Sequence, residues 1–370
     1  MTCEEGPLMS LGFKLFVFDI QSPDGDIIDC VLSHQQPAFD NPELKGQKPL
    51  NPPERPSGYN LSDETIEDFQ LWSMSGESCP QGTVPIRRIT EEDILRFGDI
   101  STFGRKTIER SIKRAAYKEH EYAIGTLNKG TYFGTQATIS LWAPSVEGRN
   151  EFSVSQIWLG NRNANGGELN TIEVGWQVYP NMYGGDTHPR FFIYWTRDDY
   201  QKTGCYNLVC SGFVQTNSKI VIGASISPVS TYGGEKYVIK LFTWKDPKTG
   251  NWWLQYGGNL VGYWPSFLFT NLRSHARYVH FGGEIINSWR KDGLHTSTQM
   301  GSGHFAEEGT RKASYFRNLQ VVNEHNTLIP APPLNLHTDN PTCYNIKGGQ
   351  DQVFGNYFFY GGPGRNQWCP

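Results

Sequence analysis

The chain has 370 residues and a formal net charge of −4, with 14% aromatic residues and 40 glycines. No block of basic residues stands out, which argues against a nucleic-acid partner, and no apolar run is long enough to span a bilayer. The length suggests two domains, and the many rings and glycines favour tightly turning β-structure.

The first 20 residues do not resemble a secretory signal peptide. Their apolar stretch is short, is interrupted by Lys14 and follows acidic residues. Residues from about 20 to 115 are rich in proline and charge and contain few strand-like runs, and 40–60 resemble an extended loop. This part of the chain therefore predicts a small, largely irregular domain.

Two short helices are predicted within that region, one after Ser62 and one after Thr90. In the second, Asp93 occupies the capping-box position and Gly98 ends the helix. Residues 106–122 also have helical spacing and are basic, so we expect an exposed segment that a protease can cut.

The pattern changes after about residue 120 to repeated short strands. Glycine, asparagine, aspartate or proline separates most of them, and no long amphipathic helix intervenes. This pattern predicts an antiparallel sandwich or barrel. The expected strands lie within residues 131–142, 152–160, 171–179, 190–197, 219–227, 236–244, 252–264 and 276–287.

Seven cysteines are present, without zinc-finger spacing. Cys205 and Cys210 are close enough to bridge a hairpin, and Cys343 and Cys369 could pin the C-terminal tail. Without Cys3 the count is even, which favours disulfides in a secreted protein over unpaired thiols.

Common catalytic motifs are absent: no H-E-x-x-H, G-x-S-x-G, P-loop or G-x-G-x-x-G occurs. His275 and His280 are five residues apart and would face opposite sides of a strand. We therefore expect neither a metal nor a cofactor.

Two strands each carry a glutamate two residues from a glycine on the same face. Glu173 accompanies Gly175, and Glu284 accompanies Gly282. A missing side chain beside each carboxyl would let a substrate backbone approach. The alternative is that both glutamates are solvated on an outer face, which is the commoner situation for a single strand glutamate.

Six ordered blocks resemble the plant neprosin family of secreted glutamic endopeptidases. The resemblance extends from about Ser22 to the C-terminus. The blocks are SPDGDIIDCV (22–31), QQPAFDNPELKGQK (35–48), CPQGTVPIRRITEEDILR (79–96), TIEVGWQV (171–178), CYNLVCSGFVQ (205–215) and FGGEIINS (281–288).

The resemblance implies an activation peptide over 1–115 and a catalytic domain over 116–370. The expected fold is a mainly β, antiparallel two-sheet β-sandwich, a concanavalin-like jelly roll, preceded by a smaller α+β or irregular propeptide domain. It also implies disulfides between Cys205 and Cys210 and between Cys343 and Cys369, and we add a pairing of Cys30 with Cys79.

The family's catalytic residues correspond to Glu173 and Glu284. Two carboxyls brought together do not both ionise readily, so one would hold a proton while the other activates water. We expect activity in acid, inhibition by the chain's own propeptide, and peptide substrates cleaved after proline. Expected substrate contacts that share the glutamates' face are Gly175, Gln177, Gly282 and His280.

Aromatic residues such as Trp176 and Tyr194 could line a proline pocket, although alternation places Trp176 away from Glu173. The family is secreted, so the lack of a signal peptide suggests an incomplete gene model. The glycosylation sequon at Asn60 fits secretion. The remaining alternatives are a non-catalytic carbohydrate-binding sandwich and a cell-wall protein that has lost activity.

Overall fold

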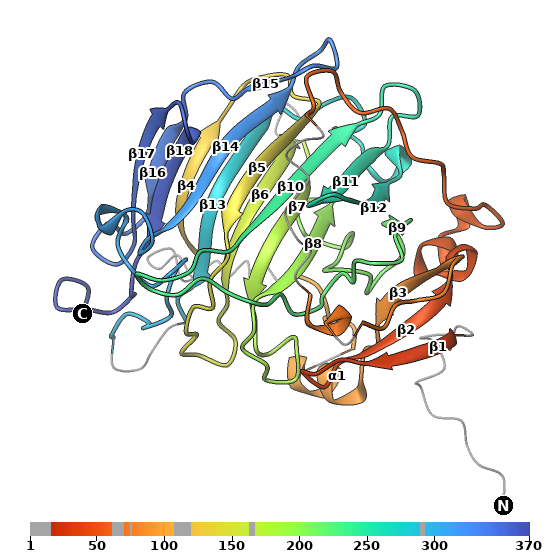
Figure 1. The fold of residues 1–370 in the computed structure, drawn as a ribbon, viewed down its shortest axis with the longest axis horizontal. Coiled ribbons are helices and arrows are strands. Elements are labelled where there is room, and N and C mark those ends of the chain that lie inside the picture. Colours follow the sequence, from red (N-terminus) through yellow and green to blue (C-terminus); the bar gives the residue numbers. More distant parts are fainter. Residues whose placement is uncertain are drawn as a thin grey trace, which may run out of the picture.

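The protein is mainly β in the computed structural model, which describes residues 16–60, 70–74, 76–98, 100–106, 120–162, 167–288 and 293–370. A three-stranded, a six-stranded and a nine-stranded sheet account for its named strands (Figure 1), and every pair of these strands is antiparallel. Within the described part of the chain, no helix has the length and apolar character needed to cross a membrane.

The N-terminal region forms the three-stranded sheet in the order β1–β2–β3, a sheet that composition alone did not predict. Its strands are β1 (Phe16–Gln21), β2 (Ile27–Leu32) and β3 (Thr83–Arg87). A disulfide joins Cys30 of β2 to Cys79, which confirms the expected pairing.

The helix predicted after Thr90 is present as α1 (Glu91–Phe97). The Thr90 hydroxyl accepts the Asp93 N–H, and the Asp93 carboxylate accepts the Thr90 N–H, which completes the capping box. Gly98 is the C-cap, as expected. The segment predicted to be helical after Ser62 lies largely outside the described residues, and so do residues 107–119; His120–Tyr122 belong to a strand rather than to a helix.

The six-stranded sheet has the order β16–β4–β13–β6–β7–β8. Its strands, in chain order, are β4 (His120–Leu127), β6 (Ser153–Arg162), β7 (Leu169–Val178), β8 (Arg190–Thr196), β13 (Tyr278–Ile286) and β16 (Asn335–Thr338). The sequence located β6, β7, β8 and β13.

The nine-stranded sheet has the order β17–β18–β14–β5–β10–β11–β12–β9, with β15 paired to β14. Its strands are β5 (Gly134–Ser140), β9 (Val214–Gln215), β10 (Val238–Lys245), β11 (Trp252–Tyr256), β12 (Asn259–Trp264), β14 (Ser314–Val322), β15 (Leu328–Pro330), β17 (Asn345–Asp351) and β18 (Gly355–Gly361).

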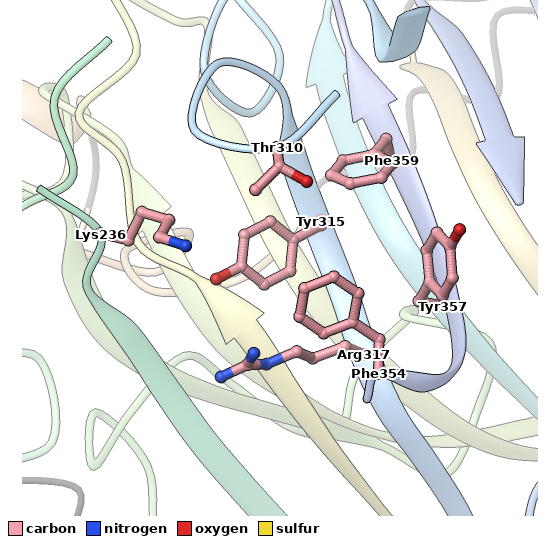
Figure 2. A pocket seen from close by; sticks show the side chains of 7 residues that line it. All are labelled: Lys236, Thr310, Tyr315, Arg317, Phe354, Tyr357 and Phe359. Carbon is pink, nitrogen blue, oxygen red and sulfur yellow. The ribbon is translucent and has the colours of Figure 1, made fainter. Parts of the chain in front are cut away.

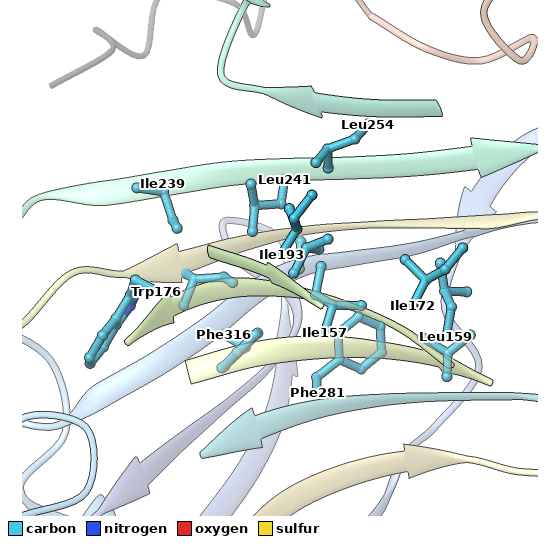
Figure 3. Packing of buried hydrophobic residues seen from close by; sticks show 14 of the residues in the cluster. Ile157, Leu159, Ile172, Trp176, Ile193, Ile239, Leu241, Leu254, Phe281 and Phe316 are labelled. Atoms are coloured by element: carbon cyan, nitrogen blue, oxygen red, sulfur yellow. The ribbon is translucent and has the colours of Figure 1, made fainter. Parts of the chain in front are cut away.

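One hydrophobic core joins the two large sheets. Ile157 and Ile172 from the six-stranded sheet share a buried cluster with Leu241 and Leu254 from the nine-stranded sheet (Figure 3). Burying each such side chain stabilises the fold by roughly 1.5–3 kcal/mol. The expectation of two antiparallel sheets packed as a sandwich is therefore confirmed.

One expected strand is wrong. Residues 219–227 form a turn, with Gly223 at φ +93° and only isolated bridges at Ser225 and Ile226. The apolar residues there are buried as part of a loop, so their run resembled a strand without pairing as one.

The N-terminal sheet packs against the sandwich through a cluster of buried charges. The Arg190 guanidinium of β8 lies 2.5 Å from Asp26, 2.7 Å from Asp186 and 3.4 Å from Asp24. Asp26 also binds Arg87 of β3, at 2.8 Å. Five charged groups from two parts of the chain thus hold these parts together.

Candidate active site

The two glutamates lie on β7 and β13 of the six-stranded sheet, on either side of β6. Strand β6 lies between β7 and β13, and paired residues on neighbouring strands share a face. Gln156 of β6 pairs with Gly175 on one side and Gly282 on the other. Glu173 and Glu284 lie two residues beyond these glycines, so they occupy diagonal positions on either side of Gln156.

This face is opposite to the hydrophobic core. The next residue along β6, Ile157, points into the core (Figure 3), so Gln156 points away from it. Glu173 is 0% exposed and Glu284 is 2% exposed. The interpretation of both as solvated residues on an outer face is therefore wrong, because neighbouring loops and the N-terminal region cover the face.

The two glycines allow close packing of the strands rather than opening a space. A Cβ at Gly175 would lie 2.0 Å from the Ser155 carbonyl oxygen. A Cβ at Gly282, which has φ +147°, would lie 2.3 Å from the Ala123 carbonyl oxygen. The expected room for a substrate backbone at these positions is thus filled by the neighbouring strands, which corrects the reason given for these glycines.

Hydroxyl groups anchor one oxygen of Glu173. Its Oε1 accepts a hydrogen bond from Thr171 Oγ1 at 2.9 Å and another from the Tyr200 hydroxyl at 2.6 Å. The other oxygen, Oε2, points towards the middle of the site. Glu173 thus has one fixed oxygen and one available oxygen.

Glu284 differs, because both of its oxygens have hydrogen-bond partners on neighbouring strands. Its Oε1 lies 2.5 Å from His120 Nδ1 and accepts a hydrogen bond from the Tyr122 hydroxyl at 3.2 Å. Its Oε2 accepts the Gln156 amide N–H at 2.9 Å. Burial raises the pKa of Glu284, but the charge of Lys106 and the hydrogen bond from His120 outweigh it and hold this pKa below its usual value.

Lys106, at the end of the described N-terminal region, places its ammonium between the two carboxylates. Its Nζ lies 2.5 Å from Glu173 Oε2 and 4.0 Å from Glu284 Oε2. The two oxygens are therefore no further apart than these two distances added together. The same ammonium thus lies within 4.0 Å of both carboxylates.

Aromatic rings surround the same ammonium. Lys106 Nζ lies 5.2 Å from the ring centroid of Tyr194, 5.7 Å from that of Tyr200 and 5.8 Å from that of Tyr206. Burial disfavours its charge, but Glu173 and Glu284 outweigh burial and raise the pKa of Lys106. The lysine is thus held as a cation in the site.

The backbone before Lys106 is fixed on the sandwich. The Tyr206 N–H donates to the Gly104 carbonyl at 2.7 Å, and Lys106 N–H donates to the Tyr194 hydroxyl at 3.3 Å. Gly104 has φ +70°, and a Cβ there would lie 2.8 Å from Val209. A glycine is therefore needed where the chain turns into the site.

The other predicted substrate contacts surround this centre to different degrees. His280 faces the same side, stacks on Tyr278 and contacts Asn128 Oδ1 at 2.9 Å, and burial lowers its pKa to about 4. Gln177 donates to the Tyr183 hydroxyl at 2.9 Å and does not contact either glutamate.

The two aromatic candidates for a proline pocket lie on opposite faces. Trp176 is buried in the core, where its Nε1 donates to the Ser140 carbonyl, whereas Tyr194 lies beside Lys106. The alternation that placed Trp176 away from Glu173 therefore holds in the structure.

Sequence reasoning missed the side chains that contact the carboxylates. Their signal was weak, because most of them lie in other segments than the two glutamates and only the fold brings them together. Gln156 and Thr171 are the exceptions, since they face the same side as the glutamates on strands that the sequence did predict. The missed residues are Lys106, His120, Tyr122, Gln156, Thr171 and Tyr200.

Two other places could have held chemistry. A pocket over β14 and β18 of the nine-stranded sheet is lined by aromatic and cationic side chains (Figure 2), whereas both glutamates lie on the six-stranded sheet. Among the described residues, His295, Cys343 and Cys369 have the spacing of metal ligands. Cys343 and Cys369 are joined by a disulfide, so they offer no thiolate, and a further disulfide joins Cys205 to Cys210.

Comparison with known proteins gives two family matches. The neprosin model matches residues 149–363, and the neprosin activation peptide model matches residues 19–126. The first match includes both glutamates, and the second includes Lys106 and His120.

Similar solved structures are distant. Scytalido-glutamic peptidase with a peptide-based transition-state analogue is 11% identical, with a TM-score of 0.34 over 66% of this chain and 98% of that one. SCP-B, a member of the eqolisin family of peptidases in complex with the tripeptide Ala-Ile-His, is 12% identical, with a TM-score of 0.34 over 65% and 98%. The family assignment therefore depends on the two sequence matches.

Proposed function

This chain belongs to the neprosin family, and from that premise we propose that it is a glutamic endopeptidase made as a zymogen, active in acid and cleaving after proline. Glu173 and Glu284 are the proposed catalytic residues. The observation that carries the proposal is that each glutamate presents one buried oxygen to the same point, where Lys106 Nζ now lies.

Lys106 accounts for the latency of the zymogen. Its ammonium occupies the place that a water and a scissile carbonyl would need, and it neutralises the carboxylates that would act on them. Lys106 lies in the region matched by the activation-peptide model, and removing the part of it that precedes β4 would uncover the glutamates. We place the activation peptide over about 1–115 and the catalytic domain over about 116–370.

Hydrolysis needs one protonated and one ionised carboxyl. The ionised glutamate takes a proton from water, and the resulting hydroxide attacks the scissile carbonyl carbon while the protonated glutamate gives its proton to the carbonyl oxygen. As the intermediate collapses, the first glutamate gives its proton to the leaving amine, and one hydroxyl of the intermediate returns a proton to the second glutamate. The two groups titrate as a pair, so activity would be highest in acid.

Preference for proline would depend on shape and stacking, because the proline ring is rigid and lacks an N–H. Trp158 and Tyr122 lie edge to face beside the glutamates, with ring centroids 6.3 Å apart. Such rings offer flat apolar surfaces to a proline side chain.

Secretion fits the cysteine chemistry. Three disulfides join Cys30 to Cys79, Cys205 to Cys210 and Cys343 to Cys369. Such bonds persist in oxidising compartments, so we propose an extracellular, cell-wall or vacuolar location.

The test is to express the full chain in a secretory host and to acidify it with a proline-containing peptide library. Mass spectrometry would follow maturation and peptide cleavage together. We expect cleavage after proline in acid, insensitive to EDTA, and a loss of at least about 100-fold in kcat for Glu173→Gln and for Glu284→Gln. A neutral optimum, full activity in either variant, or glycan binding without hydrolysis would contradict the proposal.

A further inference from the structure

Gln156 is the residue at the centre of the site whose hydrogen bonds are incomplete. Its side chain is fully buried on β6, and the residues beside it on β7 and β13 are Gly175 and Gly282. Because both of these neighbours lack side chains, the Gln156 carboxamide is the side chain of this row, and it lies between the strands that carry Glu173 and Glu284.

One end of the carboxamide is used and the other is free. The Nε2 donates to Glu284 Oε2 at 2.9 Å, whereas Oε1 is buried and has no hydrogen-bond partner among the described residues. A buried acceptor left unpaired costs stability, and native structures rarely tolerate it without a reason. An unpaired acceptor beside two candidate catalytic carboxyls indicates a place for a hydrogen-bond donor that the zymogen lacks.

Building on the peptidase function proposed above, we propose that Gln156 is a third catalytic residue that holds the attacking water together with Glu284. The water donates one hydrogen to Glu284 Oε2 and the other to Gln156 Oε1. Glu284 takes the first proton, the hydroxide oxygen bonds to the scissile carbon, and Glu173 gives its proton to the carbonyl oxygen. Collapse breaks the C–N bond as Glu284 gives its proton to the amine, and one hydroxyl of the intermediate returns a proton to Glu173, which leaves a neutral carboxylic acid and restores both glutamates.

This arrangement also assigns the two glutamates. The Gln156 N–H donates to Glu284 Oε2, which favours the ionised carboxylate there. Lys106, His120 and Tyr122 also face Glu284, and each supplies a positive charge or a donor. After Lys106 leaves, Gln156, His120 and Tyr122 still favour Glu284 as the base, so Glu173 acts as the acid.

The test compares two buried glutamines. Gln156→Met preserves length but removes both the donor and the acceptor. Gln136→Met is the control, because Gln136 is also buried, also has an unpartnered Oε1 and donates only to Gln320, on the other sheet. With matured enzyme and a proline-containing peptide, we expect Gln156→Met to lose about 100-fold or more in kcat with KM nearly unchanged.

A second variant separates chemistry from packing. Glutamate has almost the shape of glutamine, and its protonated carboxyl offers both a donor and an acceptor. Gln156→Glu should therefore approach wild-type kcat at the lowest pH and lose activity steeply as the added carboxyl ionises. The control variant Gln136→Glu should not show this steep loss of activity, and its pH profile should resemble that of the wild type.

The outcomes distinguish the two proposals. If wild type is active, Glu173→Gln and Glu284→Gln are inactive, and Gln156→Met matches Gln136→Met, then the role of Gln156 is refuted and the peptidase function stands. If Gln156→Met fails to fold, the pH profile of Gln156→Glu decides, and a profile like that of wild type refutes the proposal. If wild type hydrolyses nothing, the proposed function fails, and the role of Gln156 fails with it.

Discussion

Lys106 and Glu173 form a buried ion pair between the N-terminal region and the six-stranded sheet, with 2.5 Å between Nζ and Oε2. The lysine side chain is 12% exposed and the glutamate side chain is 0% exposed. Removing one partner of such a pair leaves the other charge buried without compensation. Latency and stability should therefore depend on the same contact.

Lys106→Met should weaken latency. Without the ammonium, the N-terminal region loses its strongest contact with the glutamates, which we estimate at about 3 kcal/mol. We expect acid maturation of the full chain to be on the order of 10- to 100-fold faster and to begin at higher pH. Arg105→Met is the matched control, because Arg105 is exposed and donates to the Lys202 carbonyl rather than to either glutamate. Equal maturation rates for the two variants would contradict the role of Lys106.

Docking of the N-terminal region should weaken as pH falls. In the docked state the pKa of Glu284 is lowered from its usual 4.5. The contribution of this carboxylate to the stability of the docked state is therefore complete above pH 4.5 and is lost as the pH falls through the lowered pKa. Burial raises the pKa of Asp24, but hydrogen bonds from Ser22 and Ser225 and the charge of Arg190 outweigh it and hold this pKa below 3.8, so its contribution is lost in the same direction.

Maturation measured from pH 2 to 8 by mass spectrometry should therefore be slow at neutral pH and should accelerate below about 4.5. The pH dependence of the catalytic activity must be separated from that of docking. The full chain is therefore first exposed to acid, and added wild-type enzyme then cleaves it in trans at one fixed pH. A maturation rate that is greatest at neutral pH would contradict this prediction.

Arg190→Met should strongly destabilise the full chain. Arg190 is 1% exposed and faces Asp24, Asp26 and Asp186; without it the buried carboxylates of Asp24 and Asp26 lose this cation, although Arg87 still contacts Asp26. We expect a loss of about 3–5 kcal/mol in the free energy of unfolding at neutral pH. Urea unfolding measures it, with Arg96→Met as the control, because the exposed Arg96–Glu92 pair contributes about 0.5 kcal/mol.

Tyr200→Phe should lower kcat of the matured enzyme by about tenfold. The Tyr200 hydroxyl donates to Glu173 Oε1 at 2.6 Å, and a typical hydrogen bond contributes about 0.5–1.5 kcal/mol, the upper end of which corresponds to tenfold in rate. Tyr232→Phe, which removes an exposed hydroxyl bound to Glu308, is the control and should leave kcat unchanged. Steady-state kinetics on both matured variants would show whether Tyr200 orients Glu173.

The sequence predicted those parts of the fold that depend on local patterns. Alternation along 171–178 placed Trp176 in the core and Glu173 on the opposite face, and the capping box located α1. The run at 219–227 failed, because a positive φ at Gly223 turns the chain where hydrophobicity alone resembled a strand. Periodicity reports which residues are buried more reliably than how the backbone pairs.

The partners of the two glutamates were beyond the reach of such patterns. Lys106 approaches Glu173 across 67 positions of sequence, and His120 approaches Glu284 across 164. The first contact depends on the packing of the N-terminal region against the sheet and the second on the pairing of β4 with β13, and no local signal encodes either. Gly175 and Gly282 are the opposite case. The sequence showed a glycine near each glutamate, but the physical reason for these glycines is the close approach of the neighbouring strands.

The position of Lys106 in the chain also determines how inhibition should respond to dilution. Lys106 and His120 are separated by residues 107–119, so a cut within that interval converts a tethered inhibitor into a separate chain. Before the cut, the effective concentration of the lysine at the glutamates is fixed by the tether; afterwards it depends on the amount of protein present. Cut but undiluted enzyme should therefore remain partly silent through the Arg190 contacts, and dilution alone should release further activity.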